Sequence, residues 1–407
     1  MKYAQKNEKI HLAFIGCGGH GGKNITRFSS LKDAEIIALC DGSTDTAEMA
    51  GHALPGNPKK YNDFRIMLDE MSSEIDAVVI STPDHTHAPA ALKAMKLGMH
   101  CFCEKPLAHT VKECRQMAAV ADEKNLVTQM GILIHATENY RRVVELIQSG
   151  IIGTVTEVHV WCGKGWGGTE TRPAEIVPIP SGFSWDLWLG PARERPFHPC
   201  YLHGNWRRWW DFGSGTLGDM ACHLMDLPFW ALNLTAPTEI KAEGPPREFQ
   251  TEMAPLWLQV NYTFPYENNT VKLTWYDGEQ VPPILSKLHL PLWNMGILFI
   301  GTEGTLMADY NRRLLYPETK FIGVKEPEPW IQKSVGHHAE WLYAIRDHGE
   351  TTCNFTYSAR LSEAVLLGVI AYRTGRKLRW DTKKMEFIED KEAQNLLQTE
   401  YRDGWKF

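Results

Sequence analysis

Three polar side chains stand where proton-transfer chemistry is expected. Lys105 lies in the turn 104–106, which reads Glu-Lys-Pro, and Asp219 and His223 share one helix face because they are spaced i and i+4. A histidine near its natural pKa can accept the proton of a substrate hydroxyl, and an aspartate can orient it. A lysine close to another cation shifts toward its neutral form. We expect Lys105, Asp219 and His223 to be catalytic, with His223 as the acid/base, oriented by Asp219.

Each of these residues also has a purely structural explanation. Lys105 could be a solvated lysine, and Asp219 with His223 could be an ion pair along a helix. Zinc held by Asp219, His223 and another histidine is a further alternative, but no third ligand stands at a recognisable spacing. We therefore expect no metal.

A glycine-rich turn near the start predicts the cofactor. Residues 12–21 read LAFIGCGGHG, a buried strand followed by a full G-x-G-x-x-G. Gly16 makes the tight turn, Gly18 lets the backbone approach a pyrophosphate, and Gly21 lets the next helix pack on the strand. The alternative, a flexible glycine loop, is weakened by the strand and helix patterns around it.

The strand that follows indicates which dinucleotide binds. Residues 35–40 form a second strand pattern, apolar after Glu35, and Asp41 comes directly after it, where a carboxylate would accept from a ribose hydroxyl. Asp41 would repel a 2′-phosphate, and residues 42–44 contain no arginine. NAD is therefore favoured over NADP.

The elements around these motifs indicate an α/β fold with two domains. Strand and helix patterns alternate up to residue 130, which predicts a doubly wound parallel sheet of the Rossmann type over residues 1–130. Alternating strands then predict an α+β domain over residues 131–407, with an open, mostly antiparallel sheet for substrate binding and oligomerisation. The helix predicted over residues 359–373 could pack back on the first domain.

Two loops lie at the edge of the parallel sheet where ligands bind, beyond the carboxyl ends of the strands. Residues 82–87 follow one strand, and the turn 104–106 follows another. His85 and His87 are more typical of cofactor-side hydrogen-bonding groups than of metal ligands, and packing in the core is the alternative for either. The predicted cofactor-binding residues are Gly16, Cys17, Gly18, Gly19, His20, Gly21, Asp41, Thr82, Pro83, Asp84, His87, Glu104 and Lys105.

Tryptophans are concentrated between residues 161 and 210, in a chain that has 15 of them. A flat aromatic ring can pack on the C–H face of a pyranose, so we expect part of this segment to line a carbohydrate site. Core or oligomer packing is the alternative for each ring. The predicted substrate-binding residues are Lys105, His135, Trp161, Trp166, Trp206, Arg207, Trp209, Asp219 and His223.

Composition excludes several classes of protein. The 407 residues are 43% hydrophobic and 23% charged, with a formal charge of -6 and no basic runs, which argues against nucleic acid as a partner. No apolar run approaches the roughly 18 residues that cross a bilayer. The first nine residues lack the apolar core of a secretory signal, so we expect a cytoplasmic protein, or a periplasmic one if a signal has been removed. Nine cysteines, several in apparent strands, are expected to be reduced.

Taken in order, the motifs resemble those of the Gfo/Idh/MocA family, the relatives of glucose–fructose oxidoreductase and inositol dehydrogenase. They are the G-x-G-x-x-G turn at 16–21, the loop 82–87, the E-K-P turn at 104–106 and the D-x-x-x-H pair at 219–223. The resemblance implies a Rossmann domain, an open-faced sheet that often forms a dimer or tetramer interface, and sugar or cyclitol substrates. It also implies catalytic roles for Lys105, Asp219 and His223.

Two departures from common family members leave the substrate open. Residues 129–135 replace a frequent G-F-N-R-R type of segment, and the tryptophan-rich insert over 161–210 is long. The leading hypothesis is an NAD-dependent dehydrogenase acting on a hydroxyl of a sugar, glycoside or cyclitol. The alternative is a glycoside-cleaving enzyme with tightly held NAD, which oxidises its substrate transiently. A non-catalytic NAD-binding sensor is a third reading, but Lys105, Asp219 and His223 together argue against it.

Overall fold

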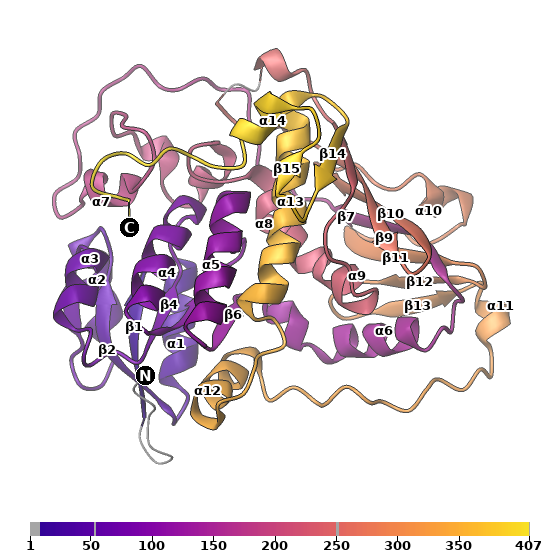
Figure 1. Ribbon diagram of the computed structural model, residues 1–407, viewed down its shortest axis with the longest axis horizontal. Helices are drawn as coiled ribbons and strands as arrows, with labels where there is room; N and C mark the ends of the chain where they lie inside the picture. Colours follow the sequence, from indigo (N-terminus) through magenta and orange to yellow (C-terminus); the bar gives the residue numbers. More distant parts are fainter. Residues whose placement is uncertain (1–8, 53, 250–251, 407) are drawn as a thin grey trace.

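Two sheets lie side by side in the computed structural model, which describes residues 9–52, 54–249 and 252–406 (Figure 1). The first eight residues, part of the stretch on which the localisation prediction rests, lie outside this description. None of the helices in the described ranges is long and apolar enough to cross a membrane. All nine cysteines are free, and eight of them are buried.

Within the described residues, the first sheet has six strands in the order β3-β2-β1-β4-β5-β6, and all of its pairings are parallel. Its central strands are apolar on both sides because helices cover both faces. This confirms the predicted doubly wound sheet. The strands are β1 (Ile10–Ile15), β2 (Ala34–Cys40), β3 (Lys59–Tyr61), β4 (Ala77–Ile80), β5 (His100–Cys103) and β6 (Thr128–Met130).

Helices from both ends of the chain cover this sheet. Side chains of α3, α4 and α5 pack in the core on one face, and those of α1 pack on the other. The late helix α12 (His337–Asp347) lies beside α1, where Trp341 packs edge-on against Phe28. The helices of the first 130 residues are α1 (His20–Ser29), α2 (Thr44–His52), α3 (Phe64–Glu70), η1 (Asp84–Thr86), α4 (His87–Lys96) and α5 (Val111–Glu123).

In the part of the chain that the structure describes, the second sheet has nine strands in the order β13-β12-β11-β7-β10-β9-β8-β14-β15. Its pairings are antiparallel except for β7 with β10, so the predicted open, mostly antiparallel sheet is confirmed. The strands are β7 (Val155–Cys162), β8 (Glu239–Glu243), β9 (Gln259–Tyr266), β10 (Asn269–Asp277), β11 (Met295–Gly301), β12 (Thr305–Ala308), β13 (Arg313–Tyr316), β14 (Leu378–Asp381) and β15 (Glu386–Phe387).

The helix α13 (Phe355–Thr374) runs between the two sheets (Figure 1). Asn354 caps its start, and almost all of its residues are buried because it packs on both sides. On the side of the first sheet, Ser362 Oγ accepts from the backbone N–H of Leu107, and Glu363 pairs with Arg115. The remaining helices are η2 (Leu133–Ala136), α6 (Glu138–Gln148), α8 (Gly215–Leu224), α9 (Asp226–Ala231), η5 (Arg247–Phe249), α10 (Ile284–Lys287), α11 (Glu318–Phe321) and α14 (Lys391–Asn395).

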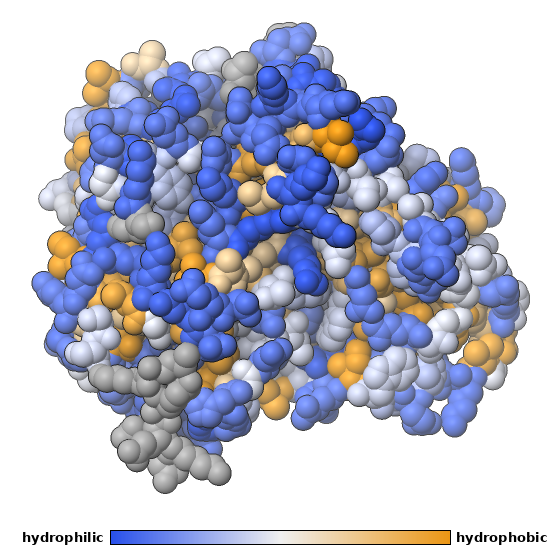
Figure 2. Space-filling model, in the orientation of Figure 1, coloured by the Kyte–Doolittle hydropathy of each residue, from blue (hydrophilic) through white to orange (hydrophobic). Residues whose placement is uncertain are grey.

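The tryptophan-rich segment folds as an insert between β7 and α8. It contains α7 (Trp185–Leu189), η3 (Pro199–Tyr201) and η4 (Asn205–Arg208) around a small aromatic core of its own. The outer surface in Figure 2 is mostly polar, with apolar side chains in small separate groups.

Several elements differ from the pattern-based expectation. The short strands β8 and β13 and the C-terminal elements β14, β15 and α14 lie where the sequence indicates no element. These elements have two to five residues each, too few for a periodic pattern to stand out.

Candidate active site

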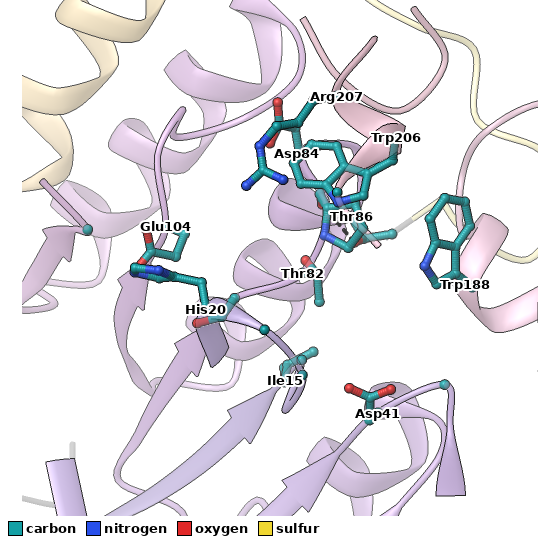
Figure 3. A pocket seen from close by; sticks show the side chains of 18 of the residues that line it. Ile15, His20, Asp41, Thr82, Asp84, Thr86, Glu104, Trp188, Trp206 and Arg207 are labelled. Carbon is teal, nitrogen blue, oxygen red and sulfur yellow. Dashed lines mark hydrogen bonds and ion pairs between the residues drawn. The ribbon is translucent and has the colours of Figure 1, made fainter. Parts of the chain in front are cut away.

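One cavity of about 960 Å³ collects most of the predicted site residues. It lies at the carboxyl ends of β1, β2, β4 and β5, and the insert and α8 form its other walls. Figure 3 shows His20 and Glu104 at one side, Asp41 at another, and Asp84, Trp206 and Arg207 near each other. A ligand that fills this cavity touches both the first sheet and the insert.

The glycine turn leaves room for a dinucleotide at this edge. Gly16 has a φ of +88°, and a Cβ at Gly21 would lie only 2.1 Å from the Gly16 carbonyl oxygen, so α1 packs directly on the turn. Gly18 and Gly19 line the cavity, and no atom lies within 4 Å of a Cβ built at Gly19. The bare backbone therefore fits a pyrophosphate at the start of α1.

Asp41 is held in place for a ribose. Its carboxylate accepts from the backbone N–H of Cys17 at 2.8 Å and from that of Ser43 at 3.0 Å. Burial raises the pKa of Asp41, and these two hydrogen bonds oppose the rise. Cys17 takes part through its backbone alone, because its thiol is buried and donates to the Cys40 carbonyl. The residues present thus fit the adenosine half of NAD.

Lys105 belongs to a tight charged cluster with Asp219. Its ammonium donates to Asp219 Oδ1 at 2.6 Å and to the Asp219 carbonyl at 2.8 Å. Arg207 Nε donates to the same Oδ1 at 2.7 Å, and Trp166 Nε1 donates to Oδ2 at 2.8 Å. The carboxylate therefore carries three side-chain donors from three different segments.

This cluster favours the charged form of Lys105 and opposes the shift toward the neutral form that a cation beside it would cause. Burial disfavours its ammonium, but the Asp219 carboxylate outweighs burial and raises the pKa of Lys105. Burial also opposes ionisation of Asp219, yet Lys105 and Arg207 hold the pKa of that carboxyl well below its usual range. The neutral form requires a lysine that faces only like charge, whereas here the nearest partner is an anion.

His223 lines the same cavity but is not oriented by Asp219. Within the described residues no hydrogen bond joins them, and His223 Nδ1 is buried without a partner. Burial and, next, the charge of Lys105 lower the pKa of His223 to about 3, so its imidazole is neutral at neutral pH. This differs from the expectation of a histidine near its natural pKa and makes His223 a weaker proton acceptor than the sequence predicts. The predicted Asp219–His223 pair is therefore corrected: Asp219 turns toward the two cations, which attract it more strongly than a neutral ring.

Glu104, the neighbour of Lys105 in the chain, lines the cavity and is held by polar contacts. Its Oε1 accepts from Asn24 Nδ2 at 2.8 Å and lies 3.2 Å from His20 Nε2. His338 Nε2 is 3.1 Å from Asn24 Oδ1, so α12 joins the same network. Burial opposes ionisation, but the contacts with His20 and Asn24 lower the pKa of Glu104 to about 2. Asn24 and His338 belong to no sequence motif, and the available signal was a polar residue on the buried face of α1.

The loop after β4 contributes to the cavity with most of its residues. Thr82, Pro83 and Asp84 line it, and burial raises the pKa of Asp84 to about 8 despite the nearby Lys105. His87 lies elsewhere: its two ring nitrogens are each 2.9 Å from a backbone carbonyl, of Pro106 and of Thr82. His87 thus ties the two loops together from within the protein and does not line the cavity.

The structure separates the predicted substrate residues into two groups. Trp206 and Arg207 line the cavity, and Trp166 reaches it through Asp219. Trp161 is fully buried against the second sheet, where it donates to the Trp293 carbonyl, and Trp209 belongs to the aromatic core of the insert. His135 is also buried, 3.0 Å from Asp226 and stacked on Trp230.

Other cavity residues were not found from the sequence. They have no motif of their own, and most lie in loops that only the tertiary fold brings to the cavity. These residues are Phe64, Lys164, Phe183, Leu187, Trp188, Leu202, His203, Tyr310 and Trp405.

Comparison with known families covers nearly the whole chain. A model described as the NAD-binding Rossmann fold of an oxidoreductase family, Gfo/Idh/MocA, matches residues 10–132. The C-terminal alpha/beta domain of the same family matches residues 137–407. The predicted NAD-binding Rossmann domain is therefore confirmed.

Solved structures share the fold at low identity. The WlbA dehydrogenase from Bordetella pertussis, in complex with NADH and UDP-GlcNAcA, is 18% identical with a TM-score of 0.64, covering 92% of this chain and 99% of its own. The myo-inositol 2-dehydrogenase from Lactobacillus plantarum is also 18% identical, with a TM-score of 0.61, covering 91% and 99%.

Curated relatives match over a shorter region. A glycosyl hydrolase family 109 protein from Shewanella putrefaciens is 32% identical over 160 residues, which is 37% of this chain and 34% of that protein. The match thus spans about a third of the relative's length. The two family models together cover both parts of the molecule, and the chain belongs to the Gfo/Idh/MocA family of oxidoreductases.

Proposed function

We propose that this protein oxidises a secondary hydroxyl of a sugar, glycoside or cyclitol with NAD. The observation that carries the proposal is the placement of the Lys105–Asp219 pair and His223 in the same cavity as the dinucleotide turn. Bound NAD supplies a hydride acceptor for the carbon that carries the hydroxyl. The UDP-GlcNAcA bound to the WlbA dehydrogenase and the myo-inositol after which the Lactobacillus plantarum enzyme is named agree with this class of substrate.

Each side chain at the proposed reaction site has its own role toward the substrate. The Lys105 ammonium, held by Asp219, donates a hydrogen bond to the hydroxyl oxygen and stabilises negative charge that develops there. The neutral His223 imidazole accepts the hydroxyl proton. Trp206 packs on the C–H face of the ring, and Arg207 donates to neighbouring hydroxyls.

A screen of sugars, cyclitols and aryl glycosides tests this proposal. NAD and one candidate are added to the purified protein, and NADH absorbance and aglycone release are followed together. Steady NADH formation with a sugar or cyclitol supports the dehydrogenase. Failure of all candidates to yield either signal, in protein shown to bind NAD, would contradict a carbohydrate oxidation.

Net glycoside cleavage is a second candidate, favoured by the family 109 glycosyl hydrolases among the relatives. In this reaction a ring carbon gives up a hydride and its hydroxyl gives up a proton, the aglycone is eliminated, water adds, and the hydride returns to the sugar. No redox equivalent is consumed overall. Aglycone release without accumulation of NADH would identify this reaction in the same screen.

Assembly is a separate part of the proposal. We infer that the chain forms a homo-oligomer through its second sheet, as the family resemblance implies. Light scattering of the purified protein tests it, and a monomeric mass at micromolar concentration would contradict it.

A further inference from the structure

The C-terminal end of the chain forms part of the wall of the nucleotide cavity. Trp405 is only 2% exposed and lines the same cavity as Asp41. Its ring lies 5.8 Å from the ring of Phe64, and the Arg65 guanidinium lies 4.3 Å above it. Because Asp41 marks the ribose of the adenosine half, Trp405 belongs to the adenosine end of the site.

A second segment, residues 180–190 of the insert, covers the same end. The backbone N–H of Thr44 donates to the Gly182 carbonyl at 2.9 Å, and that of Ser184 donates to the Gly42 carbonyl at 2.8 Å. These contacts bracket the residues that directly follow Asp41. Phe183, Leu187 and Trp188 of this segment line the cavity. The loop that carries Asp41 is therefore joined to the insert by backbone hydrogen bonds.

Arg402 fastens the C-terminal segment, residues 396–406, to residues 180–190. Its Nε donates to the Gly190 carbonyl at 2.5 Å, and its Nη1 donates to Asp186 Oδ1 at 2.5 Å. Arg65 Nη1 donates to the Gly404 carbonyl at 3.0 Å, and the Lys112 N–H donates to the Leu397 carbonyl at 3.1 Å. In Figure 1 the yellow C-terminal segment runs over the first domain to the side of α7.

We propose that Trp405 is a cofactor-binding residue, and that residues 180–190 and 396–406 form one cap, latched by Arg402, that slows the exchange of NAD. The Arg65 guanidinium lies over the ring of Trp405, and that of Arg402 is 5.6 Å from the ring centroid. The part of the indole that lines the cavity is the surface against which an adenine ring can pack. A nucleotide that leaves by its adenosine end must first break the contacts of the cap. The inference rests on the NAD-binding domain and goes beyond the proposed oxidation, which specifies no rate of cofactor exchange.

Dissociation of labelled NAD in the absence of substrate tests the cap. The full-length protein is loaded with radiolabelled NAD, chased with excess unlabelled NAD, and sampled by rapid filtration. Trp405→Leu removes the aromatic face, and Arg402→Ala removes the latch while leaving Trp405 in the chain. We expect each variant to lose label about tenfold faster than the unmodified protein.

Matched controls separate the cap from general damage. Trp330→Leu removes a tryptophan that is 51% exposed, and Arg379→Ala removes an exposed arginine paired with Glu389; both should exchange NAD at the unmodified rate. Thermal unfolding of each nucleotide-free variant checks folding. If Trp405→Leu fails to fold, the NAD dissociation rate of Arg402→Ala tests the cap by itself. Unchanged dissociation from folded cap variants would overturn the inference. Because no sugar is present, this result is independent of the oxidation proposal.

Discussion

At the scale of single residues, the charge on Lys105 and His223 decides how the site handles a proton. Lys105 stays protonated beside Asp219, while burial and Lys105 keep His223 neutral. A donor and an acceptor therefore face one cavity without neutralising each other. This arrangement suits removal of a hydroxyl proton while its oxygen is held by a cation.

We expect His223→Ala to lower turnover by about 10²–10⁴-fold, the usual effect of removing a positioned acid/base. NAD affinity should stay unchanged, because the predicted nucleotide contacts lie in other loops. Turnover is measured with the substrate found in the screen, and NAD binding by titration. Lys105→Ala should also be severely impaired, but should leave the imidazole in place.

Exchanged roles would give a different result. If His223→Ala kept near-normal turnover while Lys105→Ala abolished both the activity and its pH profile, Lys105 would be the proton acceptor. Asp219→Asn separates the cases further, because it removes the anion that keeps Lys105 charged. With His223 as the acceptor, this variant should lose activity through weaker stabilisation of the oxygen.

A second prediction at this scale concerns the dinucleotide. Asp41 should accept from a ribose hydroxyl and repel a 2′-phosphate, so NAD should bind more tightly than NADP. Asp41→Ala combined with Ser43→Arg should reduce or reverse this preference in a direct binding titration. Tighter binding of NADP by the unmodified protein would show that Asp41 does not select the cofactor.

At the scale of elements, the insert has two kinds of tryptophan. Trp206 lines the cavity from η4, whereas Trp209, one residue past the end of η4, is 2% exposed and packs edge-on against Tyr201. Sequence position alone does not distinguish them, since they lie three residues apart. At η4, the ring of Trp206 lies at the cavity and the ring of Trp209 lies in the aromatic core of the insert.

We expect alanine substitutions to separate these two roles. Trp206→Ala should raise the substrate KM while leaving NAD binding and thermal stability nearly unchanged. Trp209→Ala should lower the free energy of unfolding by about 3–5 kcal/mol, as for other buried tryptophans. Steady-state kinetics and denaturant unfolding measure the two effects. A wild-type KM in folded Trp206→Ala would place the sugar elsewhere in the cavity.

At the scale of the whole molecule, buried titratable groups make stability depend on pH. Burial lowers the pKa of eight histidines in the described ranges. At pH values between their folded and unfolded pKa values, the folded chain therefore binds fewer protons than the unfolded chain. The histidines are His85, His87, His100, His109, His159, His223, His337 and His338. Burial raises the pKa of four carboxyl groups, which act in the opposite direction: Asp41, Asp84, Glu113 and Asp277.

The histidines outnumber these carboxyl groups, so acid should destabilise the fold. As pH falls below about 6.5, the unfolded chain takes up protons that the folded histidines refuse. For each proton that the unfolded chain binds in excess of the folded chain, the free energy of unfolding falls by about 1.4 kcal/mol per unit decrease in pH. The thermal midpoint of the nucleotide-free protein should fall steadily from pH 7 to pH 5, and His100→Gln should reduce the slope. A midpoint that rises over this interval would give the carboxyl groups the larger effect.

Local signals in the sequence were sufficient for the fold class, the family and the cofactor. The G-x-G-x-x-G turn and the alternation of strands and helices depend on neighbours within about 30 residues, where spacing carries the geometry. The domain division at residue 130 stays a prediction, and the packing of α12 beside α1 shows that late residues also cover the first sheet. Strands of two to five residues lack a periodic pattern and were missed.

Contacts between distant residues needed the tertiary structure. The i and i+4 spacing places Asp219 and His223 on one helix face. It does not predict that Lys105, 114 residues away, donates a hydrogen bond to the Asp219 carboxylate. Trp405 likewise has no local motif and lines the cavity in a segment that Arg402 joins to the insert and Arg65 joins to the first domain. Charged groups and apolar rings pair with the residues that lie close to them in the folded chain. The spacing of residues in the sequence does not determine which distant residues are close in space.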